Sequence, residues 1–319
     1  MFLTSRLWVL GLALLIVCFS TPAFAETIPI FDAHNQMDDG LTVNEMISLM
    51  DAAGVERIFF AGRVPRHDTF VLEAAKLYPK RIFPLLRTKG DKDFEASDAN
   101  LKRQFNDAAR DPRYFGMAEL LVYHAFKPAY NERERKIFLT DAKVGYAIEF
   151  AEKRKWPLIL HIEMAAAGEM RQTYMNQLEQ FLSDHPQLPV LMMHMAQLDS
   201  MDVERLIQTH PNIHFMTGHL KFLSGNPDKE DSSEQVLPWT PMFMEGRLLE
   251  PWKDLFLRYP ERFIYASDAM LVNQWRKRYV KRIHIWQRVF QELPSDVAHK
   301  IAHQNAERLW HLEEYSEQR

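Results

Sequence analysis

The 319-residue chain predicts a (β/α)8 barrel, and three features of its sequence lead to that prediction. Short runs rich in β-branched and aromatic residues alternate with longer amphipathic stretches, a pattern typical of repeated βα units around a parallel sheet. Eight of these runs can be counted, which favours a closed barrel in a chain of this length. Breakers such as Trp156-Pro157 and His210-Pro211 precede the runs, whereas polar residues gather where the runs end. Active sites of such barrels lie at the carboxyl ends of the strands, so the polar ends mark the expected site.

The expected strands and helices follow one another from residue 28 to residue 269. The strand runs are Ile28–Gln36, Arg57–Val64, Arg81–Thr88, Phe115–His124, Pro157–Glu163, Pro189–Gln197, Asn212–Lys221 and Arg262–Ala269. The helical stretches between them include Val43–Ala53, Asp93–Ala109, Asp141–Lys155, Met170–Ser183, Met201–Gln208 and Leu249–Tyr259. The first set consists of short apolar runs bounded by turn residues, and in the second set apolar residues recur on one helical face.

One polar stretch, Leu223–Gln235, interrupts this alternation before the eighth strand. It is followed by Pro238 and Trp239. Long loops in a compact domain often close over an active site, and an ordinary mobile loop is the equally weighted alternative. This stretch is therefore the candidate lid.

The first 25 residues differ from the rest of the chain and predict a secretory signal peptide. Arg6 precedes the apolar run Leu7–Phe19, and the small-residue ending Ala23-Phe24-Ala25 follows it. The apolar run is shorter than the roughly 20 residues that a membrane-spanning helix needs, so we expect cleavage and no stable membrane insertion afterwards. The mature chain, residues 26–319, would then be a single barrel domain exported to the periplasm.

The composition excludes several kinds of site and partner. The single cysteine, Cys18, lies in the expected leader, so the mature chain can form neither a disulfide nor a thiolate metal site. Any metal ion must therefore be bound by His, Asp or Glu. The formal net charge of −4 provides no positive surface for nucleic acid. A small molecule is the expected substrate.

Five potential metal ligands stand near the ends of five different expected strands. They are His34, Glu119, His161, His194 and Asp268. A barrel brings such positions together, whereas a lone histidine at a strand end is more often a structural residue. Imidazole and carboxylate donors without thiolate suit zinc or a similar divalent ion in a catalytic site. Asp268 also has a structural alternative, as the N-cap of a following helix.

Six segments at or after the expected strands carry a family resemblance. They are Phe31-Asp-Ala-His34, Gly116-Met-Ala-Glu119, Pro157-Leu-Ile-Leu-His161, Leu191-Met-Met-His194, Arg262-Phe-Ile-Tyr-Ala-Ser-Asp268 and Lys300-Ile-Ala-His-Gln-Asn305-Ala-Glu-Arg-Leu309. Through them the chain resembles the amidohydrolase superfamily, especially its amidohydrolase-related (amidohydrolase 2) branch. The resemblance implies that His34, His161 and Glu119 hold one divalent metal ion, expected to be zinc. It further implies that His194 binds or polarises the substrate and that Asp268 is both a ligand and the base.

Gln36 departs from this family pattern. The first strand of such enzymes ends in His-x-His, whereas this chain has His34-Asn-Gln36. An amide oxygen is a poorer zinc donor than a neutral imidazole, so metal affinity should fall. Three outcomes fit: a mononuclear site built from the remaining residues, a metal-free lactonase-type hydrolase in which Arg and His polarise a carbonyl, or a fold kept for binding alone.

Further residues at strand ends bear on the substrate. Arg63, Arg87 and His219 follow the second, third and seventh expected strands, and Trp239 lies in the candidate lid. Cations at these positions would favour a carboxylate-bearing substrate, and Gln36 would complete the pocket. The alternatives are solvated loop charges for the arginines and packing onto the barrel for the aromatic residues.

The sequence therefore predicts an exported enzyme that hydrolyses a small amide, ester or lactone by metal-assisted attack of water. Asp268 would take the proton from water, and His194 or an arginine would stabilise the oxyanion. A carbon–carbon lyase of the decarboxylase type is the alternative enzyme. A catalytically silent binding protein is the alternative outside catalysis.

Overall fold

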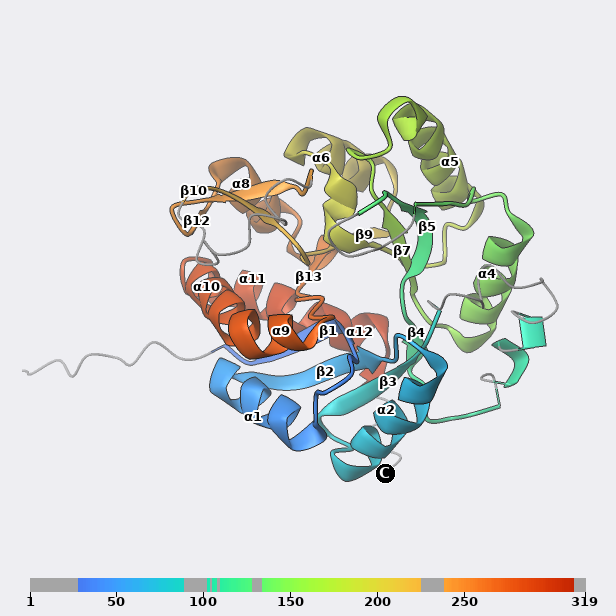
Figure 1. Cartoon of the computed structure of the whole chain (residues 1–319). Coiled ribbons are helices and arrows are strands. Elements are labelled where there is room, and N and C mark those ends of the chain that lie inside the picture. Colours follow the sequence, from blue (N-terminus) through green and yellow to red (C-terminus); the bar gives the residue numbers. More distant parts are fainter. Residues whose placement is uncertain are drawn as a thin grey trace, which may run out of the picture.

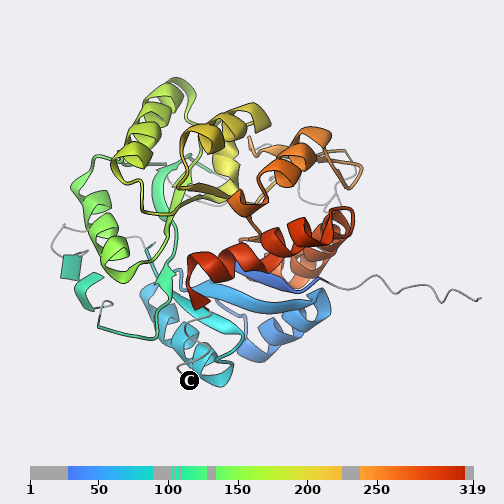
Figure 2. The same cartoon turned by 180° about the vertical axis from the view of Figure 1, so that it is seen from behind.

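The computed structural model describes residues 28–88, 102–103, 105–107, 110–127, 134–224 and 238–312. Its strands form a barrel with helices packed around the outside, as the opposite views in Figures 1 and 2 show. The predicted (β/α)8 barrel is therefore confirmed. The expected leader and most of the helix expected at Asp93–Ala109 lie outside the described residues. In the part of the chain that the structure describes, no helix is long and apolar enough to cross a membrane.

The barrel wall has eight strand positions within the described residues. They are β1 (Ile30–Gln36), β2 (Val55–Ala61), β3 (Ile82–Leu86), β4 with β5 (Gly116–Met117 and Leu120–His124), β7 (Leu158–Ile162), β8 (Val190–Met192), β9 (Ile213–Met216) and β13 (Phe263–Ile264). One sheet has the order β1-β2-β3-β4, and the other contains β13-β9-β8-β7-β5, all pairs being parallel. Backbone hydrogen bonds from Ala33 N to Tyr265 O and from Asp268 N to His34 O, each 3.0 Å, close the barrel between β1 and the last strand.

A β-bulge in β1 turns the site residues of that strand inward. Asp32 pairs with Ile58 and Asn35 with Phe60, so three steps along β1 match two along β2. Phe31 packs in the hydrophobic cluster inside the barrel. The extra residue shifts the alternation of side chains by one position, which is how a bulge redirects a strand.

The expected strands extend too far at their carboxyl ends. The run Pro189–Gln197 yields a strand only as far as Met192, and Met193–Gln197 form the turn η3. Within it His194, Met195 and Ala196 have φ of 54°, 52° and 52°, which is left-handed backbone. The apolar residues of this turn are buried, so their pattern reflects burial and not strand structure.

Helices cover the outside of the barrel. They are α1 (Val43–Ala53), α2 (Pro65–Leu77), α4 (Ala142–Arg154), α5 (Arg171–Asp184), α6 (Ser200–Thr209), α8 (Glu250–Arg258), α9 (Val272–Gln274), α10 (Val280–Gln291), α11 (Ser295–His299) and α12 (Asn305–Leu309). Side-chain caps begin several of them: Thr42 accepts a hydrogen bond from Glu45 N at 3.2 Å, and Asp199 accepts one from Asp202 N at 2.9 Å. Such caps satisfy backbone donors that the first helical turn leaves without partners.

A small sheet lies beside the carboxyl end of the barrel (Figure 1). It consists of β10 (Lys221–Ser224), β11 (Pro241–Met244) and β12 (Arg247–Leu248). The short strand β6 (Arg135–Lys136) belongs to the barrel sheet instead, where it pairs with β5. Residues 225–235 of the candidate lid lie outside the described chain. Trp239, at its far end, is only 6% exposed and so belongs to the interior of the molecule.

Aromatic side chains fill the interior below the polar residues. The Phe31 and Phe59 rings lie 4.7 Å apart between centroids, and the Phe59 and Trp310 rings lie 4.5 Å apart. Trp310 follows α12, so the end of the described chain packs into the barrel. Because this half of the interior is filled, only the carboxyl ends of the strands are left for polar chemistry.

Candidate metal centre

The alternation of side chains along two strands points the predicted site residues into the barrel. On β7, Ile159 packs in the interior cluster, so His161, two residues later, lies on the same face. After β13, Ala266 belongs to that cluster and Asp268 follows two residues later. The strand period of two therefore places His161, whereas Asp268 lies beyond the end of β13 and has left-handed backbone with a φ of 49°.

Asp268 lies at the middle of a group of histidines. Its Oδ2 is 3.1 Å from His219 Nε2 and 3.5 Å from His194 Nε2, and its Oδ1 is 3.6 Å from His34 Nε2. His34 Nε2 is also 3.6 Å from Glu119 Oε1. All five side chains are buried. The structure thus brings together four of the five predicted ligands, with His219 added.

The amide of Gln36 lies between the two carboxylates. Its Nε2 donates hydrogen bonds to Glu119 Oε1 and Asp268 Oδ1, both at 3.1 Å, and is 3.4 Å from His34 Nε2. The Gln36 Oε1 atom is buried without a hydrogen-bond partner among the described residues. Rotation of the amide by half a turn would place this oxygen between the carboxylates, where it could be a ligand to a cation.

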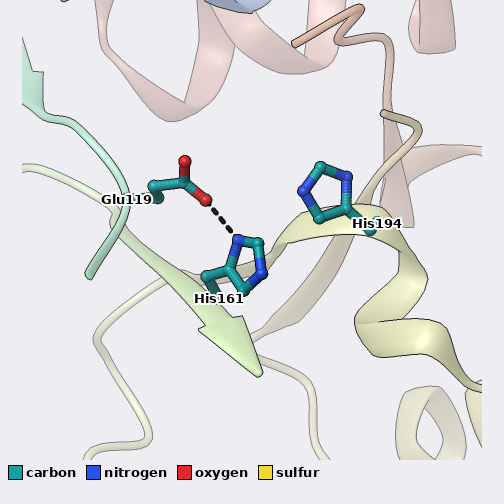
Figure 3. A group of neighbouring side chains, drawn as sticks. All are labelled: Glu119, His161 and His194. Carbon is teal, nitrogen blue, oxygen red and sulfur yellow. Dashed lines mark hydrogen bonds and ion pairs between the residues drawn. The ribbon is translucent and has the colours of Figure 1, made fainter. Parts of the chain in front are cut away.

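His161 is the fifth predicted ligand, and both of its ring nitrogens contact carboxylates. Nδ1 is 2.6 Å from Glu119 Oε2, the contact drawn in Figure 3, and Nε2 is 3.0 Å from Glu163 Oε1. Burial lowers the pKa of His161, but the Glu119 and Glu163 carboxylates outweigh it and raise that pKa above its ordinary value. His161 can donate to both carboxylates when both of its ring nitrogens carry a proton.

The charges of the other two central groups are also set by their surroundings. Burial, with the His161 and His219 rings nearby, lowers the pKa of His194 well below its ordinary value. Burial alone would raise the pKa of Asp268, but the hydrogen bond to His219, with His34 nearby, holds it below its ordinary value. At neutral pH His194 is therefore neutral and Asp268 is ionised.

A second polar group adjoins His161 and was not singled out from the sequence as a set. Lys127 Nζ donates to Glu163 Oε1 at 2.5 Å and to His124 Nε2 at 2.9 Å, and Ala125 N donates to Glu163 Oε2 at 2.8 Å. The spacing of Glu163 two residues after His161 could have placed it on the same face. Lys127 lies in a loop, where no period places a side chain.

The predicted substrate-binding residues divide into two sets. Trp239 stacks on His219 at 5.2 Å and 23° and lies 5.0 Å from the ring of His194, so it forms a wall of the centre. Arg63 instead lies 4.0 Å from Asp38, and Arg87 contacts Asp68 of α2 at 3.4 Å. Arg63 and Arg87 are not part of the buried group, and their role in substrate binding stays a prediction.

The donor set fits one divalent ion. Potential ligand atoms lie within 4.8 Å of one another in each of three overlapping groups: His34, Glu119 and Asp268; Glu119, His161 and His194; and His194, His219 and Asp268. The second group is shown in Figure 3. Two buried carboxylates in one centre need a compensating positive charge, and carboxylate with imidazole suits zinc, manganese or a similar ion. The Gln36 oxygen without a partner adds a further possible donor.

Comparison with known families confirms the resemblance inferred from the sequence. Residues 48–312 match the profile of the family described as amidohydrolase. The fold and the buried donor set define a barrel enzyme with a candidate metal centre, and the chain belongs to the amidohydrolase family. The match begins after β1, so His34 and Gln36 precede the matched segment. No curated protein matches the chain at a significant level.

Solved structures share the fold at low sequence identity. An uncharacterized TIM-barrel protein from Bordetella bronchiseptica is 16% identical with a TM-score of 0.56, over 88% of this chain and 98% of that chain. The TatD homologue YJJV from Escherichia coli is 14% identical with a TM-score of 0.57, over 88% of this chain and 97% of that chain. A manganese-bound 5-carboxyvanillate decarboxylase from Novosphingobium aromaticivorans is 14% identical with a TM-score of 0.49, over 83% of this chain and 79% of that chain. The first two similarities show the barrel fold.

Proposed function

We propose that this amidohydrolase-family enzyme hydrolyses a small amide, ester or lactone with the help of one divalent ion, of which zinc is the expected one. The observation that carries the proposal is the convergence of Asp268, Glu119 and His34 in a buried group at the carboxyl end of the barrel. This is the end at which barrel enzymes have their active sites.

His34, Glu119 and Asp268 would hold the ion, with the Gln36 amide turned to present its oxygen. When bound, a divalent ion supplies Lewis acidity, which polarises a carbonyl and lowers the pKa of water. His161 would join the ligands only by releasing Glu119 or Glu163, since both of its nitrogens are engaged. The sequence assigned His161 as a ligand, and that assignment stays a prediction.

Asp268 would act as the base. Its carboxylate is ionised at neutral pH, so it can accept a proton from the attacking water and pass it to the leaving group. Its backbone has a φ of 49°, and a hydrogen bond from Asp268 N to His34 O fixes it. The side chain is thereby held towards the histidines, instead of capping a helix.

His194 would stabilise the oxyanion that develops on the substrate. It is neutral at neutral pH, so one ring nitrogen carries a proton and can donate a hydrogen bond. Its ring lies between the rings of His161 and Trp239, at 4.9 Å and 5.0 Å, which fixes its orientation before the reaction. Donors fixed in advance stabilise developing charge without reorganisation.

The enclosed centre supports a small substrate. His34, Glu119 and Asp268 are each at most 2% exposed, and Trp239 covers the histidines. A preference for carboxylate-bearing compounds is part of the proposal because Arg63 and Arg87 follow β2 and β3 at the same end of the barrel. Export to the periplasm is also part of it, supported by the leader sequence, and mass spectrometry should find the exported chain beginning near Glu26.

The proposal is tested with lactones, esters and amides, assayed with and without a chelator. We expect turnover that the chelator removes, and a loss of about 100-fold or more in kcat on Asp268→Asn, because the amide cannot accept the proton. Asp254→Asn, an exposed site on α8, is the matched control. Turnover unchanged by Asp268→Asn would overturn the role of Asp268, and release of carbon dioxide without hydrolysis would indicate the lyase alternative.

A further inference from the structure

We propose that the ammonium group of Lys127 occupies a second cation position beside the candidate metal centre and so limits the centre to one divalent ion. The inference deepens the proposed function and rests on it, because it concerns how many ions the centre accepts. A second group of potential ligands beside the centre has no part in the proposed mechanism.

This second donor group consists of His124, His161 and Glu163. Their potential ligand atoms lie within 4.8 Å of one another, and all three side chains are buried. The group shares His161 with the first centre, where the same ring contacts Glu119. By residue type, closeness and burial, it has what a second divalent ion would require.

The Lys127 ammonium already fills that position. Its Nζ donates to Glu163 Oε1 at 2.5 Å and to His124 Nε2 at 2.9 Å. It also lies 4.9 Å from the centroid of the Trp239 ring, a cation–π contact. The Lys127 side chain is buried, and its three N–H groups are directed by these contacts.

The ammonium and a divalent ion cannot be bound there together. An ion such as zinc binds imidazole nitrogen and carboxylate oxygen at about 2.0–2.2 Å. An ion bonded to Glu163 Oε1 and His124 Nε2 would therefore overlap with Nζ, which contacts both atoms. It would also place three positive charges in a buried site that contains one carboxylate.

The balance of charge agrees with this arrangement. With His161 neutral, the first centre has two carboxylates, Glu119 and Asp268, whose charge one divalent ion would match. The second has the single carboxylate of Glu163, which matches the ammonium of Lys127. The negative charge at the first position would thus be balanced by a divalent ion, and that at the second by the ammonium of Lys127.

The test is elemental analysis after dialysis of the mature chain against manganese. We expect one ion per chain in the wild type and two in Lys127→Met, which keeps the length of the side chain and removes its charge. Lys127→Met/Glu163→Gln should return to one ion, since the second position loses its carboxylate. Lys127→Arg keeps the charge and should bind one ion, as should Lys281→Met, an exposed control on α10.

Two results would overturn the inference. One is a folded Lys127→Met, judged by circular dichroism, that binds no more ions than the wild type. The other is a wild type that binds a second ion which Glu163→Gln removes, and this comparison decides the matter if Lys127→Met does not fold. Failure of the proposed function can be told apart from failure of this inference, because the wild type would then bind no ion at all. A gain of one ion in Lys127→Met would still support the role of Lys127.

Discussion

Gln36 bridges the two carboxylates of the centre through its side-chain amide. Its amide donates to Glu119 and Asp268 at 3.1 Å each, which compensates part of their buried charge without an ion. An ion would have to replace these hydrogen bonds and accept the amide oxygen as a donor. We therefore expect Gln36 to lower the affinity of the centre for metal.

Gln36→His should raise zinc affinity by about 10-fold or more, because a neutral imidazole is a stronger donor and no longer bridges the carboxylates. Calorimetric titration with zinc measures the change. Gln180→His, on the exposed face of α5, is the control for a histidine added elsewhere. No gain in affinity would mean that position 36 does not face the ion.

His214 provides a prediction about pH, away from the metal centre. Burial, with Arg262 and Arg308 nearby, lowers the pKa of His214 to about 3 in the folded chain. The unfolded chain therefore takes up the proton first, near pH 6.5, and the folded state loses stability as the pH falls from 6.5 towards 3. Full loss at the low end is on the order of a few kcal/mol.

His214→Gln should remove this part of the pH dependence. Urea unfolding at pH 7 and pH 5 measures it, and the loss of stability between the two should be smaller in the variant than in the wild type. His311→Gln, an exposed histidine, should leave the difference unchanged. An equal loss in His214→Gln and the wild type would contradict the assignment.

At the scale of elements, the strand ends and the turns after them orient the chemistry. The turn η3 carries His194 in left-handed backbone, and Thr240 Oγ1 donates to Leu198 O at 3.1 Å, joining the turn to the segment that contains Trp239. Gly218, after β9, approaches His194 closely. A Cβ atom there would lie 2.8 Å from His194 Nδ1 and 3.2 Å from Asp268 Cβ.

Gly218→Ala should therefore displace His194. The ring cannot move away freely because Trp239 and His161 lie against it, so we expect metal binding and turnover to weaken by about 10-fold or more. Gly145→Ala, inside α4, is the matched control. A Cβ there meets nothing within 4 Å, and the change should stabilise the helix by about 0.5–1 kcal/mol. Unchanged metal binding in a folded Gly218→Ala would contradict this account of the turn.

The sequence predicted these elements well where period and burial agree. On β7, the short apolar run that ends at His161 identified the strand. After β8, Met193 and Met195 are as apolar as a strand residue and yet lie in a turn. Apolar composition shows that a segment is buried, but the backbone conformation at a strand end depends on the neighbouring segments that the chain meets there.

At the scale of the whole molecule, the barrel explains why the site could be predicted only in part. Strand-end positions converge in any closed barrel, so His34 and Asp268 could be placed together from the sequence. The partners of loop residues depend on tertiary contacts, and for that reason Lys127 was missed. Arg87 ends β3 as predicted, but the structure pairs it with Asp68 of α2. Membership of the amidohydrolase family indicates the general kind of enzyme, whereas the loops around the site determine its substrate.

Metal analysis of the purified mature chain tests the central claim most directly. Wild type and His34→Ala are compared after exposure to zinc and manganese, with His299→Ala, at the end of α11, as the control. The account predicts nearly one ion per chain in the wild type and in His299→Ala, and its loss in His34→Ala. An absence of bound metal under every loading condition, or an equal content in His34→Ala, would contradict it.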